Sequence, residues 1–526
     1  MQVYEGAIVS CDAKRGVYRY LAEDRGRILF VGDALPPEYE RAPRTGLGER
    51  CILPAFADTH IHFMSYALFS AGLDIRDARS IAEAKQMIAE RARVDRSPIV
   101  LGFGASAHRV AEGRLLARED LDAACPDTPA FIVKYDGHAG IANSALIALQ
   151  NQAARSSRGF DAETGLMTQE AFFRVTDYVT GKVSLPETLG NMLTAMDRLA
   201  SLGIGTLHSV TGVGFPLDLD VTLESLFARG LRDEVHYRVF FQTMDVGKAR
   251  RRRLPRIGGC FATALDGCFG SADAAMLEPY AEAAGLAPEA VRGILYYPDE
   301  KVRAFCLAAN RAGLQIEMHA IGDAAFEQAV SALAAALDDH PRPDHRHTII
   351  HACLPTERGL AACAELGISL AVQPAFLHWE QEPLSYLEDV MGGRALRLQP
   401  LKAISDMGIV MAGGSDAPCT VPDPLYGIWA ACNHYVPGQS LGIQEAIDLY
   451  TRNAAYVGFD DGERGSLEAG KAADLVILNR NPLELRPSDL RLLKAESLIL
   501  SGKAYRGKQG RADLVKRGLA NGGARI

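Results

Sequence analysis

The sequence has ten cysteines but no CxxC pair, and its thiols are scattered along 526 residues. Such spacing is typical of reduced, mostly buried thiols rather than of a disulfide framework. The sequence also lacks any uncharged apolar run long enough to span a bilayer, and its first residues have neither the basic nor the apolar region of a secretory signal. These absences predict a cytoplasmic protein without a membrane partner.

An excess of basic charge is also absent. Lys and Arg number 56 against 65 Asp and Glu, which gives a net charge of −9. No basic stripe is available to neutralise phosphates, which argues against nucleic acid as a partner. With 48% hydrophobic and 23% charged residues, the composition is that of a globular enzyme, so the expected partner is a small-molecule substrate. The sequence does not fix the oligomeric state, for which a homodimer is the working hypothesis.

The two ends of the chain differ in texture from its middle. Residues 1–53 and 455–526 alternate short strand-like segments with turns, whereas residues 54–454 alternate apolar runs with Ala-, Glu- and Arg-rich helical stretches. The middle pattern is typical of a parallel α/β sheet or barrel, and the two ends most simply form one small β domain. Besides the run that precedes His60, the strand candidates are 99–103, 130–134, 204–208, 237–241, 314–319, 348–351, 368–372 and 408–412. Counted together with the run before His60, these are more strands than a barrel needs, so one or two belong to an insertion.

Two histidines close the first apolar run of the middle region. His60 and His62 stand one residue apart after Pro54-Ala-Phe-Ala-Asp-Thr. On a strand, residues i and i+2 point to the same face, so the two imidazoles can lie side by side. Imidazole is the commonest protein ligand for zinc and related metals. The pair therefore predicts part of a metal site.

Further polar residues end later apolar runs. His319, His351 and Asp416 each close a predicted strand and precede small residues, which places them at strand carboxyl ends, where barrel enzymes keep their sites. His138 follows the segment Lys134-Tyr-Asp-Gly and is a fourth candidate. Gln373 is open to two interpretations, as pocket lining or as a solvated loop residue. Asp323 is a candidate hydrogen-bond partner for a ligand histidine.

The order HxH, His, His, Asp is one feature of a wider resemblance. The chain resembles the amidohydrolase superfamily and, within it, the YtcJ-like branch, also called amidohydrolase type 3. The matching stretches run over nearly the whole chain and are 53–63, 135–139, 203–208, 265–271, 318–324, 413–417 and 465–474. The resemblance implies a distorted TIM (β/α)8 barrel, a small β-sandwich built from both termini, and an insertion at about residues 64–190 that helps to cover the pocket.

The resemblance also implies roles for individual residues. His60 and His62 would be metal ligands from the first strand, His319 and His351 ligands or water-positioning groups, and Asp416 the last-strand carboxylate. One position departs from the family. Binuclear relatives carry a lysine about four residues before the aspartate of an Asp-Gly motif, where its carboxylated form bridges two metals. Here the motif is Asp266-Gly267, and the expected lysine is Ala262.

The missing lysine leaves three arrangements open. Two cations without an anionic bridge would repel each other, so the simplest is one divalent metal, most simply zinc, bound by His60, His62, His319 and Asp416, with His351 orienting water. In the second, the thiolate of Cys260 supplies the bridge after a slip of two positions, which keeps the side chain on the same face of a strand. In the third, which ranks lowest, Lys134 is the bridge; this residue is better suited to contacting substrate or pairing with Asp136.

These features predict a hydrolase that attacks a non-peptide C–N bond, most simply the amide of a small molecule. A bound divalent cation lowers the pKa of water from ~15.7 towards ~7, which makes hydroxide available at neutral pH. Asp416 would accept the proton and pass it to the leaving nitrogen, and His351 or His138 would stabilise the developing oxyanion. The alternatives are a mononuclear deaminase of an amino-substituted heterocycle and a non-catalytic binding protein on the same fold.

Overall fold

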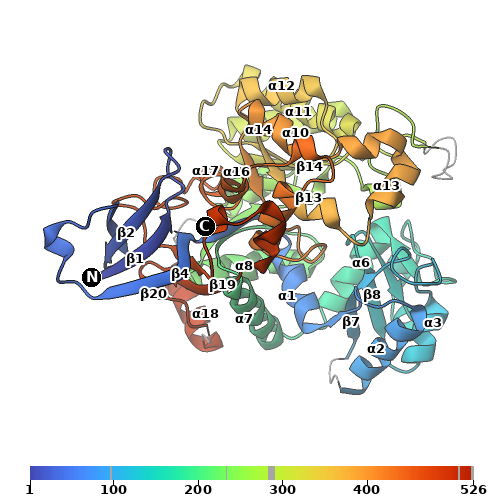
Figure 1. Cartoon of the computed structure of the whole chain (residues 1–526). Coiled ribbons are helices and arrows are strands. Elements are labelled where there is room, and N and C mark those ends of the chain that lie inside the picture. Colours follow the sequence, from blue (N-terminus) through green and yellow to red (C-terminus); the bar gives the residue numbers. More distant parts are fainter. Residues whose placement is uncertain (95–97, 233, 282–290, 508–509, 523–526) are drawn as a thin grey trace.

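The computed structural model describes residues 1–94, 98–232, 234–281, 291–507 and 510–522. Its centre is a parallel eight-stranded sheet that curls into a nearly closed barrel (Figure 1). The strands are almost fully buried, because the barrel interior covers one face and helices cover the other. In spatial order they are β5 (Phe56–Ile61), β11 (Ile204–Thr211), β12 (His236–Phe241), β13 (Arg256–Ala264), β14 (Gln315–Ala320), β15 (Thr348–His351), β16 (Ser369–Val372) and β17 (Met411–Gly413).

The barrel closes where its last strand meets its first. The backbone N–H of Asp416 donates to the carbonyl of His60 at 2.8 Å, and that of His62 donates to the carbonyl of Ala417 at 3.0 Å. These bonds fasten the loop after β17 to the end of β5. Helices follow the strands as expected for a TIM barrel, and they are α1 (Phe63–Ala71), α7 (Leu185–Ser201), α8 (Leu219–Gly230), α9 (Val246–Arg251), α10 (Asp299–Arg311), α11 (Asp323–Asp339), α12 (Glu357–Leu366), α13 (Leu384–Met391), α14 (Leu401–Asp406), α15 (Pro424–Cys432), α16 (Ile443–Leu449) and α17 (Arg452–Val457).

Both ends of the chain build a second sheet. Its seven strands run in the order β20-β19-β18-β4-β1-β2-β3, so strands from residues 2–54 and 475–504 share one ladder. Ile28 of β3 and Ile499 of β19 stand near opposite ends of this ladder yet belong to one buried cluster, so the halves of the sheet face each other across a core. The elements are β1 (Gln2–Val9), β2 (Val17–Asp24), β3 (Arg27–Gly32), β4 (Arg44–Pro54), β18 (Leu475–Leu478), β19 (Ala495–Leu500) and β20 (Lys503–Ala504), with α18 (Arg511–Ala520) packed against α8.

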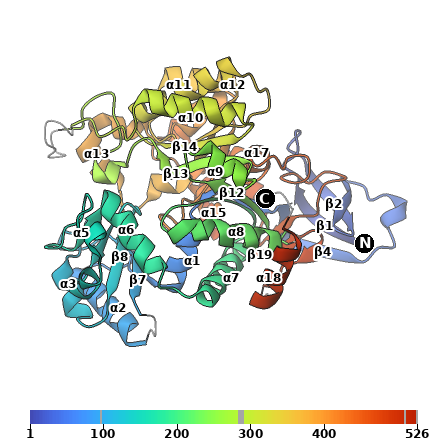
Figure 2. The same cartoon turned by 180° about the vertical axis from the view of Figure 1, so that it is seen from behind.

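A third sheet lies on the other side of the barrel from the terminal sheet (Figures 1 and 2). It forms between α1 and α7, and it contains the candidate strands 99–103 and 130–134, so these are the two candidates in excess of the barrel. The elements are β6 (Leu73–Asp74), α2 (Ile81–Val94), β7 (Val100–Ala105), α3 (Arg118–Ala124), β8 (Ala130–Lys134), β9 (Ala139–Ala142), α4 (Ser144–Ala148), α5 (Gln152–Arg155), β10 (Leu166–Thr168) and α6 (Gln169–Thr180). Among the described residues, no helix is both long and apolar enough to cross a membrane.

Sequence analysis did not predict one barrel strand. β13 contains Gly258 and Gly259, and its pairing with β14 jumps from Gly259 opposite Met318 to Ala264 opposite His319. Strand prediction from sequence depends on a run of apolar residues. The glycines of β13 and its irregular pairing interrupt that run, so the strand cannot be recognised. The jump leaves residues 260–263 as a bulge at the end of the barrel where His319 lies.

Candidate metal centre

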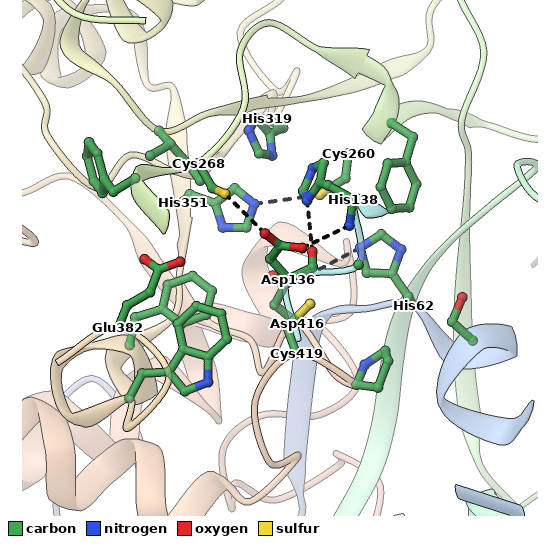
Figure 3. Close-up of a pocket in the computed structure, with 18 of the residues that line it drawn as sticks. His62, Asp136, His138, Cys260, Cys268, His319, His351, Glu382, Asp416 and Cys419 are labelled. Carbon is green, nitrogen blue, oxygen red and sulfur yellow. Dashed lines mark hydrogen bonds and ion pairs between the residues drawn. The ribbon is translucent and has the colours of Figure 1, made fainter. Parts of the chain in front are cut away.

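A pocket of about 1230 Å³, measured out to the open solvent, lies at the carboxyl ends of the barrel strands. The third sheet supplies one wall of it, through Asp136, His138, Phe172 and Phe173. His62, His319, His351 and Asp416 line its floor together with Cys260, as the labelled side chains of Figure 3 show. Of the predicted ligands and catalytic residues, all but His60 line this pocket, and His60 contacts Cys260 and Asp416, which do; Gln373, Asp323 and Lys134 are not among the lining residues.

The first strand and the last strand bring three of the predicted residues together. His60 and His62 point to the same side of the end of β5, and their ring centroids are 5.4 Å apart. Oδ1 of Asp416 lies 3.3 Å from Nε2 of His60 and 3.2 Å from Nε2 of His62. The backbone bonds that close the barrel hold this arrangement in place, because they join the same residues.

His351 is oriented by a hydrogen bond that its Nδ1 makes with Gln373. Its Nδ1 lies 2.7 Å from Oε1 of Gln373, and the Gln373 amide donates to the carbonyl of Ala371 at 3.0 Å. The amide orientation makes Oε1 the acceptor, so His351 carries its proton on Nδ1 and presents an unprotonated Nε2 to the pocket. Gln373 is thus fully buried against a site residue, and the second of its two interpretations, a solvated loop residue, is wrong.

His319 is oriented in the same way by a different partner. Its Nε2 lies 3.2 Å from the carbonyl of Gly267 and 3.3 Å from Oδ1 of Asp266, while its buried Nδ1 has no hydrogen-bond partner among the described residues. The carboxylate beside His319 is that of Asp266; Asp323 instead accepts a hydrogen bond from the backbone of Leu277 at 2.7 Å.

Cys260 lies in the middle of these side chains. Its Sγ is 3.0 Å from Nε2 of His60. The same Sγ is 3.6 Å from Nε2 of His351, which lies beside it in Figure 3. The potential ligand atoms form two groups, each with all atoms within 4.8 Å of one another: His60, His62, Cys260 and Asp416 in one, and Cys260, His319 and His351 in the other. Cys260 belongs to both groups.

The position expected for the bridging lysine lies elsewhere. Ala262 is in the β13 bulge, where its carbonyl accepts a hydrogen bond from Tyr297, and it is not among the residues that line the pocket. Lys134 pairs with other residues: its Nζ lies 2.7 Å from Oδ2 of Asp136 and 3.0 Å from Oγ of Ser271. Because this ion pair satisfies Asp136, the neighbouring cluster of Asp136, His138 and Cys268 is a poor cation site.

His138 belongs to the third-sheet side of the pocket, near the candidate ligand His319. Its Nδ1 lies 2.8 Å from the carbonyl of Asp136, which can only accept, so Nδ1 carries a proton. Its buried Nε2 has no partner among the described residues, and its ring centroid lies 6.4 Å from that of His319. The free nitrogen is placed to contact a bound substrate.

Burial and neighbouring groups set the charges of the site. Burial lowers the pKa of His60 and holds that of His351 well below its usual value, so both rings are neutral and able to bind a metal. Burial alone would raise the pKa of Asp416, but the imidazoles of His60 and His62 keep it well below its usual value. Burial raises the pKa of the Cys260 thiol, so a cation must be present for the thiolate to form.

The upper wall of the pocket contains polar residues that sequence analysis missed. Tyr135 donates a hydrogen bond to Oε1 of Glu382 at 3.0 Å, and burial raises the pKa of Glu382 to about 7. Trp379 contacts Tyr135 and stacks on Phe376, with ring centroids 4.9 Å apart. No sequence pattern joins these residues, because they come from the third sheet and from the loop after β16.

Comparison with known proteins identifies the family. The amidohydrolase family model matches residues 47–505, which include every candidate ligand. The chain belongs to the amidohydrolase family. The YtcJ-like branch inferred from the sequence is confirmed: a Bacillus subtilis (strain 168) protein named as an amidohydrolase, YtcJ, is 25% identical over 93% of this chain and 97% of its own length.

Two further relatives cover the amidohydrolase chain almost completely. N-substituted formamide deformylase of Arthrobacter pascens is 24% identical over 95% of this chain and 97% of its own length. The crystal structure of a metal-dependent hydrolase from Pyrococcus furiosus, at 25% identity, covers 92% of this chain and 100% of its own with a TM-score of 0.73. The likeness covers nearly the whole chain, and the TIM-barrel fold predicted from the sequence is confirmed.

Proposed function

We propose that this amidohydrolase is a metal-dependent enzyme that hydrolyses a non-peptide C–N bond, the amide of a small molecule. The observation that supports this most strongly is the convergence of six buried donor side chains from β5, β13, β14, β15 and the loop after β17 on one pocket floor, at the barrel end where such enzymes keep their sites. Imidazole nitrogens, a carboxylate and a thiol are the donors that zinc prefers. The donor set therefore fits a divalent cation, with zinc as the first candidate.

The proposed ligands are His60, His62, His319, His351 and Asp416, joined by Cys260. The cation supplies Lewis acidity, which lowers the pKa of water and polarises a carbonyl group. The protein supplies the proton acceptor: Asp416 is held ionised beside the imidazoles of His60 and His62, and its side chain lines the pocket. It can take a proton from water and release it to the leaving nitrogen.

His138 serves the substrate rather than the metal in this proposal. In its neutral form Nδ1 keeps the proton, so Nε2 offers a lone pair and accepts a hydrogen bond from a substrate N–H. After it takes a proton, the same nitrogen can donate to the developing oxyanion, which is the role that sequence analysis gave it. Both roles use the free nitrogen that faces His319.

The pocket wall indicates the substrate class. Of the described residues that line the pocket, none is a lysine or arginine, so the carboxylate of an N-acyl amino acid would find no cationic partner other than the metal. Aromatic rings dominate the wall instead and favour an uncharged, apolar substituent: Phe69, Phe103, Phe172, Phe173, Phe261, Phe269, Phe376, Trp379 and Tyr435. An N-substituted amide with an aryl or alkyl group fits this wall, and the deformylase of Arthrobacter pascens makes N-substituted formamides the first compounds to test.

The test begins with elemental analysis of protein purified without added metal or chelator. The zinc-loaded protein and its His60→Ala variant are then assayed with N-benzylformamide, with the matched N-formyl amino acid, and with amino-substituted heterocycles. We expect hydrolysis of the neutral amide, weaker hydrolysis of its carboxylate analogue, and loss of activity in the variant. Ammonia release from a heterocycle alone would favour the deaminase, and absence of bound metal after loading would favour the non-catalytic protein.

A further inference from the structure

Cys260 is the one side chain that belongs to both groups of potential ligands on the described part of the pocket floor. We propose that its thiolate is a ligand shared by two divalent cations, one held by His60, His62 and Asp416 and the other by His319 and His351. This inference rests on the proposed metal dependence of the enzyme and goes beyond it, because the proposed hydrolysis requires only one cation.

The number of donors argues for two cations rather than one. His60, His62, Cys260 and Asp416 already supply the four ligands of a complete tetrahedral zinc site. The unpartnered, buried Nδ1 of His319 and the unprotonated Nε2 of His351, which lies 3.6 Å from the sulfur, are then left without a role, although both histidines share a potential ligand group with Cys260. Buried polar atoms without a partner are costly, and a second cation satisfies both nitrogens at once.

Charge balance explains why the shared ligand is a thiolate. Two divalent cations a few ångströms apart repel each other strongly in a buried site, and an anion between them offsets that repulsion. Lysine is absent from this floor, and the carboxylate of Asp416 is on the side of His60 and His62. The sulfur of Cys260 instead lies between the two groups, at 3.0 Å from His60 and 3.6 Å from His351, and a large polarisable sulfur can contact two cations.

The bulge in β13 explains how a cysteine can reach this position. A regular strand would pair residue for residue with β14, but here four residues stand where the register jumps, and the first of them, Cys260, contacts His60 and His351. Gly258 and Gly259 make the bulge feasible with φ angles of +103° and +140°. The bulge thus lets the short side chain of Cys260 take the place of the longer bridging lysine.

The two proposed cation positions differ in the number of protein ligands and therefore in whether a coordination position is left for water or substrate. The group of His60, His62, Cys260 and Asp416 has four donors, whereas Cys260, His319 and His351 supply three, as catalytic zinc sites do when a fourth position is kept for water or substrate. His138 lies over this second group, nearer to His319. We therefore place the reacting carbonyl on the side of His319 and His351.

Metal stoichiometry is the decisive measurement. The wild type, Cys260→Ala and the control Cys419→Ala are loaded with zinc, freed of excess ions and analysed for metal per chain; Cys419 is a buried cysteine of the same pocket that belongs to neither group. We expect two equivalents in the wild type and in Cys419→Ala and one or none in Cys260→Ala. Two equivalents in a folded Cys260→Ala variant would overturn the shared ligand.

Cobalt provides a second readout that does not depend on how well the variants fold. Wild-type enzyme loaded with two equivalents of Co²⁺ should show a sulfur-to-cobalt charge-transfer band and magnetic coupling between the two ions, and Cys260 should resist alkylation. The shared thiolate would be wrong if the enzyme hydrolysed its amide with one equivalent of Co²⁺, showed no charge-transfer band and had a Cys260 that can be alkylated. The proposed function would then still hold. Failure to bind any metal would overturn both.

Discussion

Gln373 orients the proposed metal ligand His351 through a single hydrogen bond. By accepting from Nδ1 of His351, it fixes both the ring orientation and the tautomer that leaves Nε2 free. Partners of this kind commonly change metal affinity by 10- to 100-fold when they are removed. Because the contact joins two fully buried side chains, water cannot replace it easily.

We expect Gln373→Leu to weaken the binding of the more loosely held cation by about 10- to 100-fold. Leucine keeps the volume but has no acceptor, so His351 is free to change tautomer or to rotate. Competition with a chelating dye measures the affinity, and Gln373→Glu, which keeps an acceptor, is the matched control. Equal affinities in Gln373→Leu and the wild type would show that packing alone orients the ring.

His138 should affect turnover without affecting metal content. In His138→Phe the ring volume is kept but Nε2 is lost, and we expect kcat to fall by about 10²-fold or more, the usual range for a positioned acid or base. Metal analysis of the same preparation should give the wild-type value. A variant that loses metal together with activity would assign His138 to the metal site instead.

At the scale of the element, strand β13 is the feature that makes the site unusual. Gly258 has a φ of +103°, and a Cβ added there would lie 1.9 Å from the carbonyl oxygen of Glu317 on β14. Such a contact cannot be relieved by a side-chain rotation, since the obstructing atom belongs to the backbone of the neighbouring strand. The backbone of the bulge is therefore restricted to glycine at this position.

Gly258→Ala should destabilise the protein by about 1–3 kcal/mol or more and displace Cys260. Urea unfolding of the variant measures the first effect, and metal stoichiometry measures the second. Gly438→Ala serves as control, because an added Cβ there meets nothing within 4 Å. If both variants unfold at the same urea concentration, the bulge must be more adaptable than its contacts indicate.

At the scale of the whole molecule, Asp474 joins the terminal sheet to the barrel. Its carboxylate lies 3.1 Å from Nε2 of His236 at the start of β12 and 3.1 Å from Nε of Arg464, and it accepts from the backbone of Ser501 at 2.7 Å. Burial alone would raise the pKa of Asp474, but the hydrogen bond from His236 and the nearby Arg464 hold it at about 2, below the usual 3.8.

This lowered pKa predicts a pH-dependent contribution to stability. Because the pKa of Asp474 is lower in the folded than in the unfolded chain, its contribution of roughly 2 kcal/mol is complete above about pH 4 and is lost as the pH falls towards 2. Asp474→Asn should therefore unfold at a lower urea concentration than the wild type at pH 7, and the gap should narrow below pH 4. A gap that stays constant with pH would mean that the charge of Asp474 contributes nothing.

The third sheet closes the pocket from the side opposite the terminal sheet (Figure 2). It contributes His138, Phe103, Phe172 and Phe173 to the wall, whereas the barrel contributes the proposed ligands. This division lets the metal centre remain fixed while the insertion shapes the substrate space. The aromatic wall is thus a property of the assembled molecule and not of any one segment.

Local patterns in the sequence were enough to determine much of this protein. Apolar runs that end in His60-Ile-His62, His319, His351 or Asp416 predicted buried strands with polar ends, since period and chemistry are both local. The barrel and the family followed from the order of these motifs and are confirmed. The surplus of strand candidates predicted that one or two of them belong to an insertion, and in the structure 99–103 and 130–134 lie in the third sheet.

Only the tertiary structure decided what Cys260 contacts. Its neighbours His60 and His351 are 200 and 91 residues away in the sequence, and the strand that carries Cys260 is irregular, so no period marks it. Counting back from Asp266 led to Ala262, because counting assumes a regular strand and the bulge breaks that assumption. The residue types determined which donor atoms the site can offer. The path of the backbone determined which of those atoms lie close together.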